Sequence, residues 1–389
     1  MHRRRAGNCD DCGSDRLEYF VLLAMAMIRE SGLRGATISL RLILMLAGCV
    51  LFSARVFAAG TKISAPAFEQ MTQGAGVEPT ASVATHQEFF EFRSGFWINL
   101  HHFLYLQAVL ATPEARKGEA EKSARDASPE PAMSPAQKTV WDRAVRFYLQ
   151  YGKRDALRDD ELVKVNYELS DAGNSPNLKG RQLSHELMAT LEEAAPVYRG
   201  LWWSEHDRRN RAWIAEAAKL VGEYGPSMSQ RIATVFHAEW PKEKTTTEVV
   251  VYANWAGAYT VTNSTLITIS SADSAGQDEA SLETLFHEAS HALIGNVQRQ
   301  LSSDLLADSK TPNFGIVHVI IFYTAGVVTA DALAKNGVPD FIPYAVKNGL
   351  YERVPDWKHY REVCDNDWGP YLNGRTTFDD ALKQVAKDF

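Results

Sequence analysis

Apolar positions follow a helical repeat over most of the chain and change to strict alternation only over a short stretch. Apolar side chains that recur every three or four residues lie on one face of a helix, so this spacing predicts amphipathic helices. Residues 88–110 are apolar or aromatic at most positions, which predicts a buried helix. The helical repeat itself covers residues 140–148, 161–169, 183–194 and 211–224.

The pattern changes to that of β-strands at Thr247. Residues 248–255 are rich in β-branched and aromatic side chains, residues 258–261 continue this character, and residues 265–270 alternate with period two. Such runs predict two or three strands of a small sheet. Helical spacing returns after Asp278. We therefore predict an α+β fold that is mainly helical.

Composition and pattern together divide the chain into five parts. The segment 112–137 holds four prolines, many charges and one large apolar residue, Met133, so we expect a disordered linker or insertion. The parts are a leader (1–58), an N-terminal helical segment (59–111), the linker (112–137), a helical region (138–246), and a catalytic region with a helical C-terminal lobe (247–389).

The first part has the features of a secretory signal. Arg41 precedes the apolar run 42–52, and small residues lead to Ala58. A basic start, a short apolar middle and a small-residue end are typical of a signal peptide, so we expect cleavage after Ala58, with the residues before Met27 as an extended start. Alternatively, the sequence Leu-Ala-Gly-Cys ending at Cys49 resembles the bacterial lipobox, which implies a lipid anchor on Cys49. Both alternatives predict an exported protein, periplasmic or secreted, that meets a membrane only through this leader or anchor.

Charge and cysteine content exclude several other functions. The formal net charge of -7 offers no basic surface, so we expect no nucleic-acid partner. The four cysteines are Cys9, Cys12, Cys49 and Cys364, and the first three lie in the expected leader. Cys9 and Cys12 have the spacing of a zinc ribbon but lack the second pair that such a site needs. Cys364 alone cannot form a disulfide within the remaining chain.

The strongest chemical signal is the sequence His-Glu-Ala-Ser-His at residues 287–291. His287 and His291 lie one turn apart on the same helical face, away from the apolar face. This spacing lets both imidazoles bind one zinc ion at about 2.0–2.1 Å. Glu288 is then placed to take a proton from a metal-bound water. The apolar face of this helix comprises Leu282, Leu285, Phe286, Ala289 and Leu293.

This motif, following a strand that ends at Ser270, resembles the zincin metallopeptidases, and in particular the gluzincin-like ones. Residues 318–326 are similar to a segment of exported bacterial metallopeptidases of unknown substrate. The resemblance covers roughly residues 245–355, and only the zinc motif within it is chemically specific. It implies a two-lobed fold with a small β-sheet next to the motif helix. The free edge of the preceding strand is expected to bind extended substrate through backbone hydrogen bonds.

The third metal ligand departs from the gluzincin pattern. Gluzincins supply a glutamate from a later helix, whereas the matching helix here, about 315–335, contains none. A hydrolytic zinc site needs three protein ligands and an open position, and we predict that His318 is the third. We also predict that Tyr323 stabilises the oxyanion; the alternative for both residues is a place in the core. Other candidates for the third ligand are Asp304, Asp308, Asp331 and Glu352.

Three further clusters are weaker candidates. Adjacent residues His101 and His102 point to different helical faces, so at most one of them can face a cleft. The segment 202–207 mixes tryptophans with titratable groups, and we interpret it as the start of a helix rather than a pocket. Tyr344, Tyr351 and Trp368 are expected to lie in the core.

The sequence thus predicts an exported zinc metallohydrolase, a peptidase acting on peptide or protein substrates through zinc-activated water. Two alternatives remain open. One is a catalytically inactive periplasmic module that binds zinc or another protein on a peptidase scaffold. The other is zinc-dependent hydrolysis of a non-peptide bond by the same residues.

Overall fold

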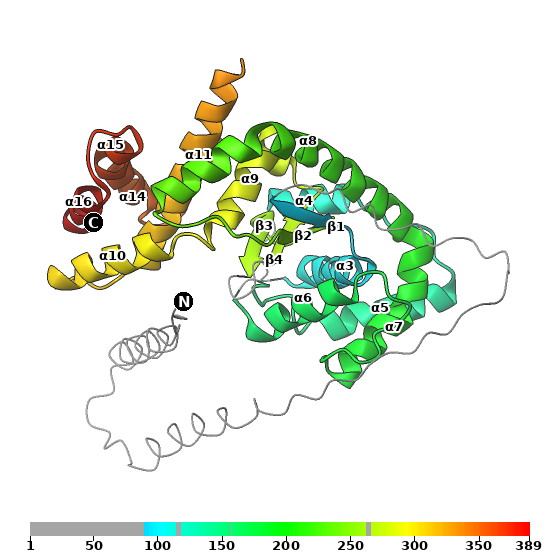
Figure 1. Cartoon of the computed structure of the whole chain (residues 1–389). Coiled ribbons are helices and arrows are strands. Elements are labelled where there is room, and N and C mark those ends of the chain that lie inside the picture. The colour runs from blue at the N-terminus through cyan, green and yellow to red at the C-terminus, as the bar shows by residue number, and fades with distance from the viewer. Residues whose placement is uncertain (1–88, 114–117, 157, 262–265) are drawn as a thin grey trace, which may run out of the picture. The chain divides into compact units, whose positions relative to one another are not determined.

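The computed structural model describes residues 89–113, 118–156, 158–261 and 266–389 (Figure 1). The expected leader, with Cys49 and the Cys9–Cys12 pair, lies outside these residues. Within them the chain is mainly helical and contains one small mixed β-sheet, so the predicted α+β class is confirmed.

The sheet has the strand order β1-β2-β4-β3. Strands β1, β2 and β4 run parallel, and β3 at the end of the order pairs antiparallel with β4 alone. The strand directly before the motif helix, β4, is therefore an inner strand, and the two edge strands are β1 and β3, of which β3 is next to β4. The strands are β1 (Phe90–Arg93), β2 (Thr245–Val250), β3 (Ala258–Val261) and β4 (Leu266–Ser270).

Strand β1 replaces the first residues of the helix expected over 88–110. The helix of this segment, α3 (Phe96–Ala111), begins only after β1 has ended. Phe90 and Phe92 are buried on the same side of the sheet, and the Phe90 ring lies 5.6 Å from that of Phe286. The partner strand begins at Thr245, far along the chain, so a local apolar pattern could not reveal the pairing.

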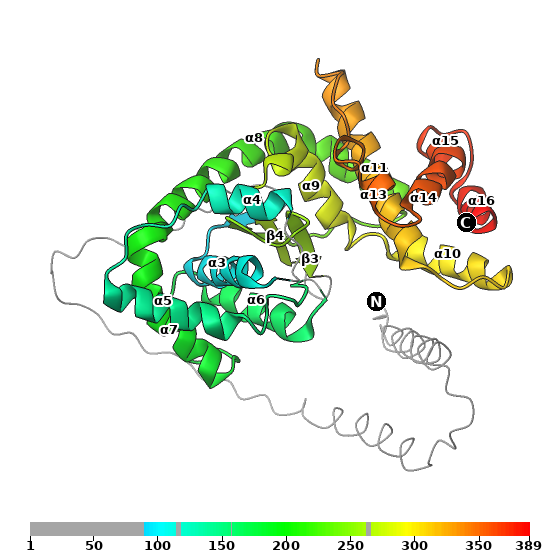
Figure 2. The same cartoon turned by 180° about the vertical axis from the view of Figure 1, so that it is seen from behind.

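Two hydrophobic cores cover the two faces of the sheet (Figures 1 and 2). Alternate residues of β2 separate them, because Val249 packs into one core and Val250 into the other. The first core contains α8 (Ser204–Val235), α9 (Glu279–Ser290) and α11 (Phe314–Lys335). The second contains α3, α5 (Pro135–Tyr148), α6 (Asp160–Ala172) and α7 (His185–Tyr198).

The expected linker over 112–137 contains the helix α4 (Glu119–Asp126), so the prediction of disorder is wrong there. Ala120 and Ala124 are buried, and Glu121 is 1% exposed and accepts a hydrogen bond from the Tyr252 hydroxyl at 2.6 Å. Its polar composition concealed the helix, because α4 buries small side chains and a carboxylate instead of large apolar groups. The helix start expected over residues 202–207 is wrong, because α7, the π-helical turn η1 (Arg199–Trp203) and α8 follow one another without a break and Trp203 itself has helical backbone angles.

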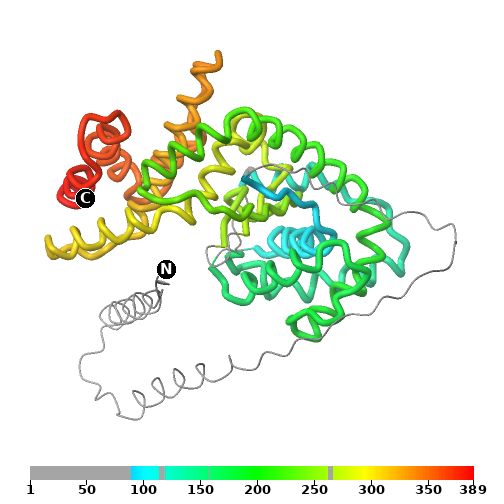
Figure 3. Tube along the Cα trace, in the orientation of Figure 1, coloured from blue at the N-terminus to red at the C-terminus, as the bar shows by residue number. Residues whose placement is uncertain are grey.

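The C-terminal part, coloured yellow to red in Figure 3, consists of helices and turns. α11 packs against both α8 and α9, and α10 packs against α16. The elements that follow α9 are α10 (Gly295–Ala307), α11, α12 (Tyr344–Lys347), α13 (Leu350–Arg353), α14 (Trp357–Val363), η3 (Cys364–Trp368), α15 (Gly369–Leu372) and α16 (Phe378–Asp388).

The motif helix α9 ends at Ser290, and a turn separates it from α10. The Ser290 hydroxyl donates to the carbonyl of Phe286 at 2.6 Å, a local bond that competes with regular helical bonding. The backbone N–H of His291 bonds to Glu288 O, three residues back, so the helix tightens as it ends.

Helix α11 is long and apolar enough to cross a membrane by composition, and 67% of its most apolar window is buried within the fold. Ile316, Ile320 and Val328 are among its buried residues and belong to the core that contains α8 and α9. Burial of this kind is typical of the central helix of a globular core. We therefore interpret α11 as a core helix.

Candidate metal centre

Three histidines from two helices meet in one place. His287 and His291 lie at the end of α9, and His318 lies in the second turn of α11. Their candidate ligand atoms all lie within 4.8 Å of one another, and His287 Nε2 is 3.3 Å from His318 Nε2. The three ring centroids are 5.2–5.3 Å apart, close to an equilateral triangle. The predicted position of His318 beside the other two is confirmed.

The sequence explains why the histidines meet. The apolar face of α9, with Leu282 and Phe286 fully buried, packs into the first core and leaves His287 and His291 on the side that faces α11. Helix α11 begins after Asn313, whose Oδ1 accepts the N–H of Gly315 at 2.6 Å. Because α9 and α11 pack together, a residue near the start of α11 reaches the end of α9.

The protonation of the triad suits a cation. Burial lowers the pKa of His287 well below its usual range, and the neighbouring His291 and His318 lower it further. Burial also lowers the pKa of His291 to about 4 and that of His318 to about 3. All three imidazoles are therefore neutral at physiological pH, and each has a nitrogen lone pair available. Three neutral nitrogen donors around one point are a donor set that fits zinc.

Glu288 lies between the triad and the edge strand β3. It is 6% exposed, and its Oε2 is 2.7 Å from Thr260 Oγ1, which is also 2.9 Å from the carbonyl oxygen of Glu288. Burial raises the pKa of Glu288 to about 7, although the Thr260 hydroxyl opposes the shift. A carboxyl group with a pKa near neutrality is suited to take up and release a proton.

The triad and Glu288 line a cavity of about 820 Å³. One wall is a stripe of α9 that carries Glu283, His287 and His291 at intervals of four residues. Strand β3, which packs against α9, also lines the cavity, as do aromatic rings from α11 and α14. The connection between α5 and α6 contributes Asp155 and Arg158, and the first residue of α6 contributes Asp160. The aromatic lining includes Phe314, Phe322, Tyr344 and Trp357.

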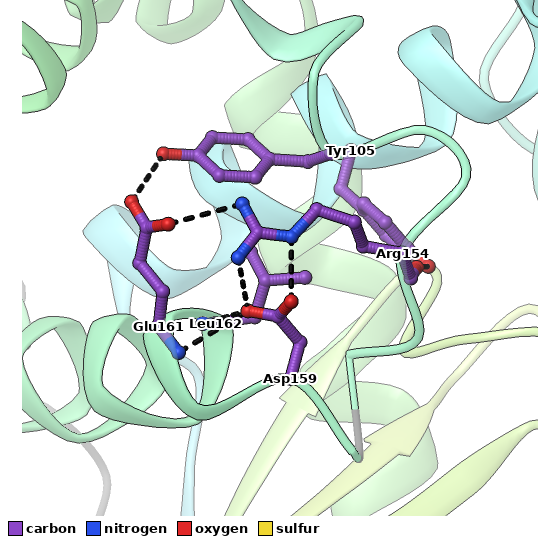
Figure 4. A network of polar contacts seen from close by, with 6 residues as sticks. Tyr105, Arg154, Asp159, Glu161 and Leu162 are labelled. Atoms are coloured by element: carbon purple, nitrogen blue, oxygen red, sulfur yellow. Dashed lines mark hydrogen bonds and ion pairs between the residues drawn. The ribbon is translucent and has the colours of Figure 1, made fainter.

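A polar network stabilises the α5–α6 connection that forms part of this wall (Figure 4). The Arg154 guanidinium donates to both oxygens of Asp159 at 2.5 Å and to Glu161 at 3.0 Å. Asp159 also caps α6 by accepting the first free N–H groups of that helix at 3.1 Å. The Tyr105 hydroxyl donates to the carbonyl of Arg154 at 2.7 Å. The network thereby anchors the connection to α3 and α6.

Tyr323 does not face this cavity, so the prediction that it belongs to the site is wrong. Its hydroxyl lies 2.8 Å from where a Cβ at Gly369 would stand, and the Arg361 guanidinium is 4.9 Å from its ring centre. Five residues rotate a helix by about 500°, which turns Tyr323 roughly 140° away from His318. Tyr344 lines the cavity instead, stacked on Phe322 with ring centres 6.4 Å apart. We had expected Tyr344 in the core.

The other candidates for a third ligand lie elsewhere. Asp304 accepts from the Gln300 side chain at 3.1 Å, and Asp331 pairs with Arg231 at 2.5 Å. Neither they nor Asp308 and Glu352 line the cavity. Within the described part of the chain, the histidine triad is the group whose ligand atoms come close enough to hold a metal ion.

The sequence missed Thr260, Glu283 and Tyr344 as cavity residues. A signal for Glu283 existed, because it lies one turn before His287 on the same face of α9. Thr260 and Tyr344 reach the cavity only through tertiary packing. His101 and His102 were weak candidates, and neither lines the cavity.

Comparison of the chain with known proteins identifies no related protein. The chain matches no family model, no curated protein and no solved structure. The functional interpretation therefore rests on the residues and geometry described above.

Proposed function

We propose that the protein is a zinc-dependent hydrolase that cleaves peptide bonds outside the cytoplasm. The observation that carries the proposal is the convergence of His287, His291 and His318 beside the buried carboxyl group of Glu288. The resemblance of residues 287–291 to the zincin motif supports it, as does a cavity large enough for several residues of a peptide.

In this proposal each group has a defined task. His287, His291 and His318 hold the ion, which when bound lowers the pKa of a water and polarises the scissile carbonyl. Glu288 accepts the proton of that water and later donates it to the leaving amine. The Thr260 hydroxyl, 2.7 Å from Glu288 Oε2, keeps the carboxyl group in place. The unpaired side of β3 offers backbone groups to an extended substrate.

The arrangement of the cavity also supports the two-lobed zincin plan. Its lining comes from α9 and α11 on one side and from the α5–α6 connection on the other. These elements belong to the two different cores that pack on the two faces of the sheet. We infer that the two cores correspond to the two lobes.

The proposal predicts the behaviour of Glu288→Gln. The variant should fold and bind about one zinc per chain, because the ligands are unchanged, while peptide hydrolysis falls by about 10²–10⁴-fold because an amide cannot accept the proton. Elemental analysis and digestion of a peptide library measure both quantities. The matched control is Glu362→Gln on the surface of α14, which should leave both unchanged.

Three results would contradict the proposal. If zinc-free wild-type protein is refolded in the presence of zinc and still binds no zinc, the proposed metal centre does not exist. Full zinc occupancy without hydrolysis of any peptide indicates the inactive zinc-binding module or a non-peptide substrate. Near-normal turnover by Glu288→Gln excludes Glu288 as the base.

A further inference from the structure

The imidazole of His287 lacks one contact that metal ligands of its kind usually have. Its Nε2 lies 3.3 Å from His318 Nε2 and so faces the other members of the triad. The second ring nitrogen, Nδ1, is buried and has no hydrogen-bond partner within the described part of the chain. Histidines that bind a metal usually donate this second N–H to a carboxylate, a carbonyl or a water, which fixes the orientation of the ring. A different contact is therefore needed to orient His287.

The ring of Phe322 packs directly on this imidazole. Phe322 lies on α11 one turn after His318. Its ring centre is 3.9 Å from that of His287, with an angle of 36° between the two ring planes. The same ring lies 5.0 Å from the ring centre of His318. One side chain thus contacts proposed ligands from both helices.

The position of Phe322 is that of a cavity residue at the edge of the first core. The side of α11 that enters this core carries fully buried residues such as Ile316 and Ile320. Phe322 is only partly buried and lines the cavity. Its other ring neighbours, Trp357 at 5.6 Å and Tyr344 at 6.4 Å, also line the cavity. The ring therefore belongs to the wall that surrounds the triad.

The shape of an imidazole explains why such a contact matters for metal binding. The nitrogen lone pair lies in the plane of the ring, so the orientation of that plane decides where a metal ion can be bound. A ring packed on the face of the imidazole resists rotation of the plane, because rotation in a close-packed wall causes overlap or opens a gap. The apolar ring also keeps water away from the ligands, which strengthens their interaction with a cation.

We infer that Phe322 is a positioning residue of the metal centre, whose ring orients His287 and His318 where a hydrogen-bonded partner is absent. The inference rests on the proposed function in so far as the triad holds a metal ion. Trp357 supports the arrangement, because its ring meets that of His318 edge-on at 5.5 Å. In this role Phe322 acts through the two histidines and does not touch the ion.

The substitution Phe322→Leu in the full-length protein tests the inference. The variant keeps an apolar side chain but loses the ring, so zinc affinity should fall by about 10–100-fold, the effect of losing a partner that orients a ligand. Competition with a zinc chelator measures the change. Phe322→Met is a second variant that removes the ring and fills more of its volume, and it should weaken zinc affinity in the same range.

The matched control is Phe314→Leu, one turn before His318 on the same helix. The Phe314 side chain is 57% exposed, and its ring centre is 6.2 Å from that of His318. Its replacement should change zinc affinity by less than about twofold, as is usual for an exposed residue. Urea unfolding of the zinc-free proteins checks that every variant is folded under the conditions of the competition experiment.

Cobalt(II) in place of zinc gives a readout that a purely structural role would not change. The visible absorption of cobalt(II) depends on the number and geometry of its ligands. Wild type and Phe314→Leu should share one spectrum. In Phe322→Leu the absorption should be weaker, because water replaces a ligand that is no longer held in the right direction.

Zinc affinity within about twofold of wild type in the folded Phe322 variants overturns the inference, as does an unchanged cobalt(II) spectrum. An equal loss of affinity in Phe314→Leu also overturns it, since the effect would not depend on the ring that contacts His287. Failure of the inference is distinguishable from failure of the proposed function. A protein that hydrolyses peptides and binds zinc equally well without the Phe322 ring keeps the function and loses the positioning role. A protein that needs this ring to bind zinc but hydrolyses no peptide keeps the positioning role and loses the function.

Discussion

Buried histidines occur in two regions of the molecule, and their surroundings differ. In the helical region on the second core, His206 lies between Ser128 Oγ and Tyr198 Oη, with 2.9 Å to each. His101 Nδ1 likewise lies 2.9 Å from Tyr148 Oη. In the cavity, two members of the triad contact each other instead: His287 Nε2 lies 3.3 Å from His318 Nε2. Burial lowers the pKa values in both regions, so a lowered pKa alone does not distinguish a metal site from a core.

Buried carboxyl groups show the same contrast. Glu248 on strand β2 is fully buried, and each of its oxygens has a partner: the Ser170 hydroxyl at 2.7 Å and the N–H of Gly95 at 3.3 Å. Glu283 in the cavity uses one oxygen and leaves the other without a partner in the described part of the chain. Glu248 is thus satisfied within the fold and Glu283 only in part, although buried atoms without a partner also occur outside the cavity, for example His102 Nδ1 and Thr329 Oγ1.

The strongest test of this contrast replaces one histidine from the triad. His318→Ala removes a proposed ligand and should weaken zinc affinity by more than about 100-fold, beyond the effect of losing an outer-shell partner. Competition with a zinc chelator measures the change. His359→Ala on the exposed side of α14 is the matched control and should bind zinc normally. Normal affinity in His318→Ala would show that the triad meets without serving as a metal site.

The converse test replaces a histidine of the helical region. His206→Phe keeps a ring against Phe103, whose centre lies 4.9 Å away, but removes the partners of Ser128 and Tyr198. Two buried hydroxyls without partners should lower the free energy of unfolding by about 2–4 kcal/mol, while zinc stoichiometry stays unchanged. Urea unfolding and elemental analysis measure the two effects. A loss of zinc without a loss of stability would reverse the assigned roles.

Much of the architecture could be predicted from local pattern. Helical periodicity located α5, α6, α7 and α8, because these helices bury apolar side chains on one face. Runs of β-branched and aromatic residues located β2 and β3, and alternation located β4, although these strands are buried on both faces of the sheet. Strand β1 was missed because its partner is distant along the chain: Phe90 pairs with Thr245. Helix α4 was missed because its buried residues are alanines and Glu121.

The candidate site was predictable to the extent that it depends on one helix. His287, Glu288 and His291 follow from a motif, and the position of His318 follows from two helices packed side by side. Tyr323 was misplaced because five residues of helix turn a side chain to another face. Thr260 and Tyr344 come from other elements, and no local spacing connects them to α9.

The hydrogen-bonded carboxyl group of Glu248 leads to a further prediction, a smaller effect of pH on the free energy of unfolding. Burial raises the pKa of Glu248 from 4.5 to about 7 in the folded protein. The folded state therefore binds more protons than the unfolded state between these values. The contribution of Glu248 to the free energy of unfolding is fully present below pH 4.5. It is lost as the pH rises through 7, which lowers the free energy of unfolding by up to about 3 kcal/mol. Glu248→Gln removes this dependence, because its amide oxygen can accept from Gly95 while its amide nitrogen donates to Ser170.

The variant should consequently gain stability relative to wild type between pH 5 and pH 8, by about 2 kcal/mol. Urea unfolding of both zinc-free proteins at the two pH values gives the difference. Glu283 and Glu288 also have raised pKa values, but their contributions are common to both proteins and cancel in the comparison. A constant difference at the two pH values would mean that Glu248 is already ionised in the folded protein at pH 5. Its hydrogen bonds to Ser170 and Gly95 would then stabilise the ionised carboxylate as much as burial destabilises it. The pKa of Glu248 would therefore be set by these hydrogen bonds rather than by the loss of hydration.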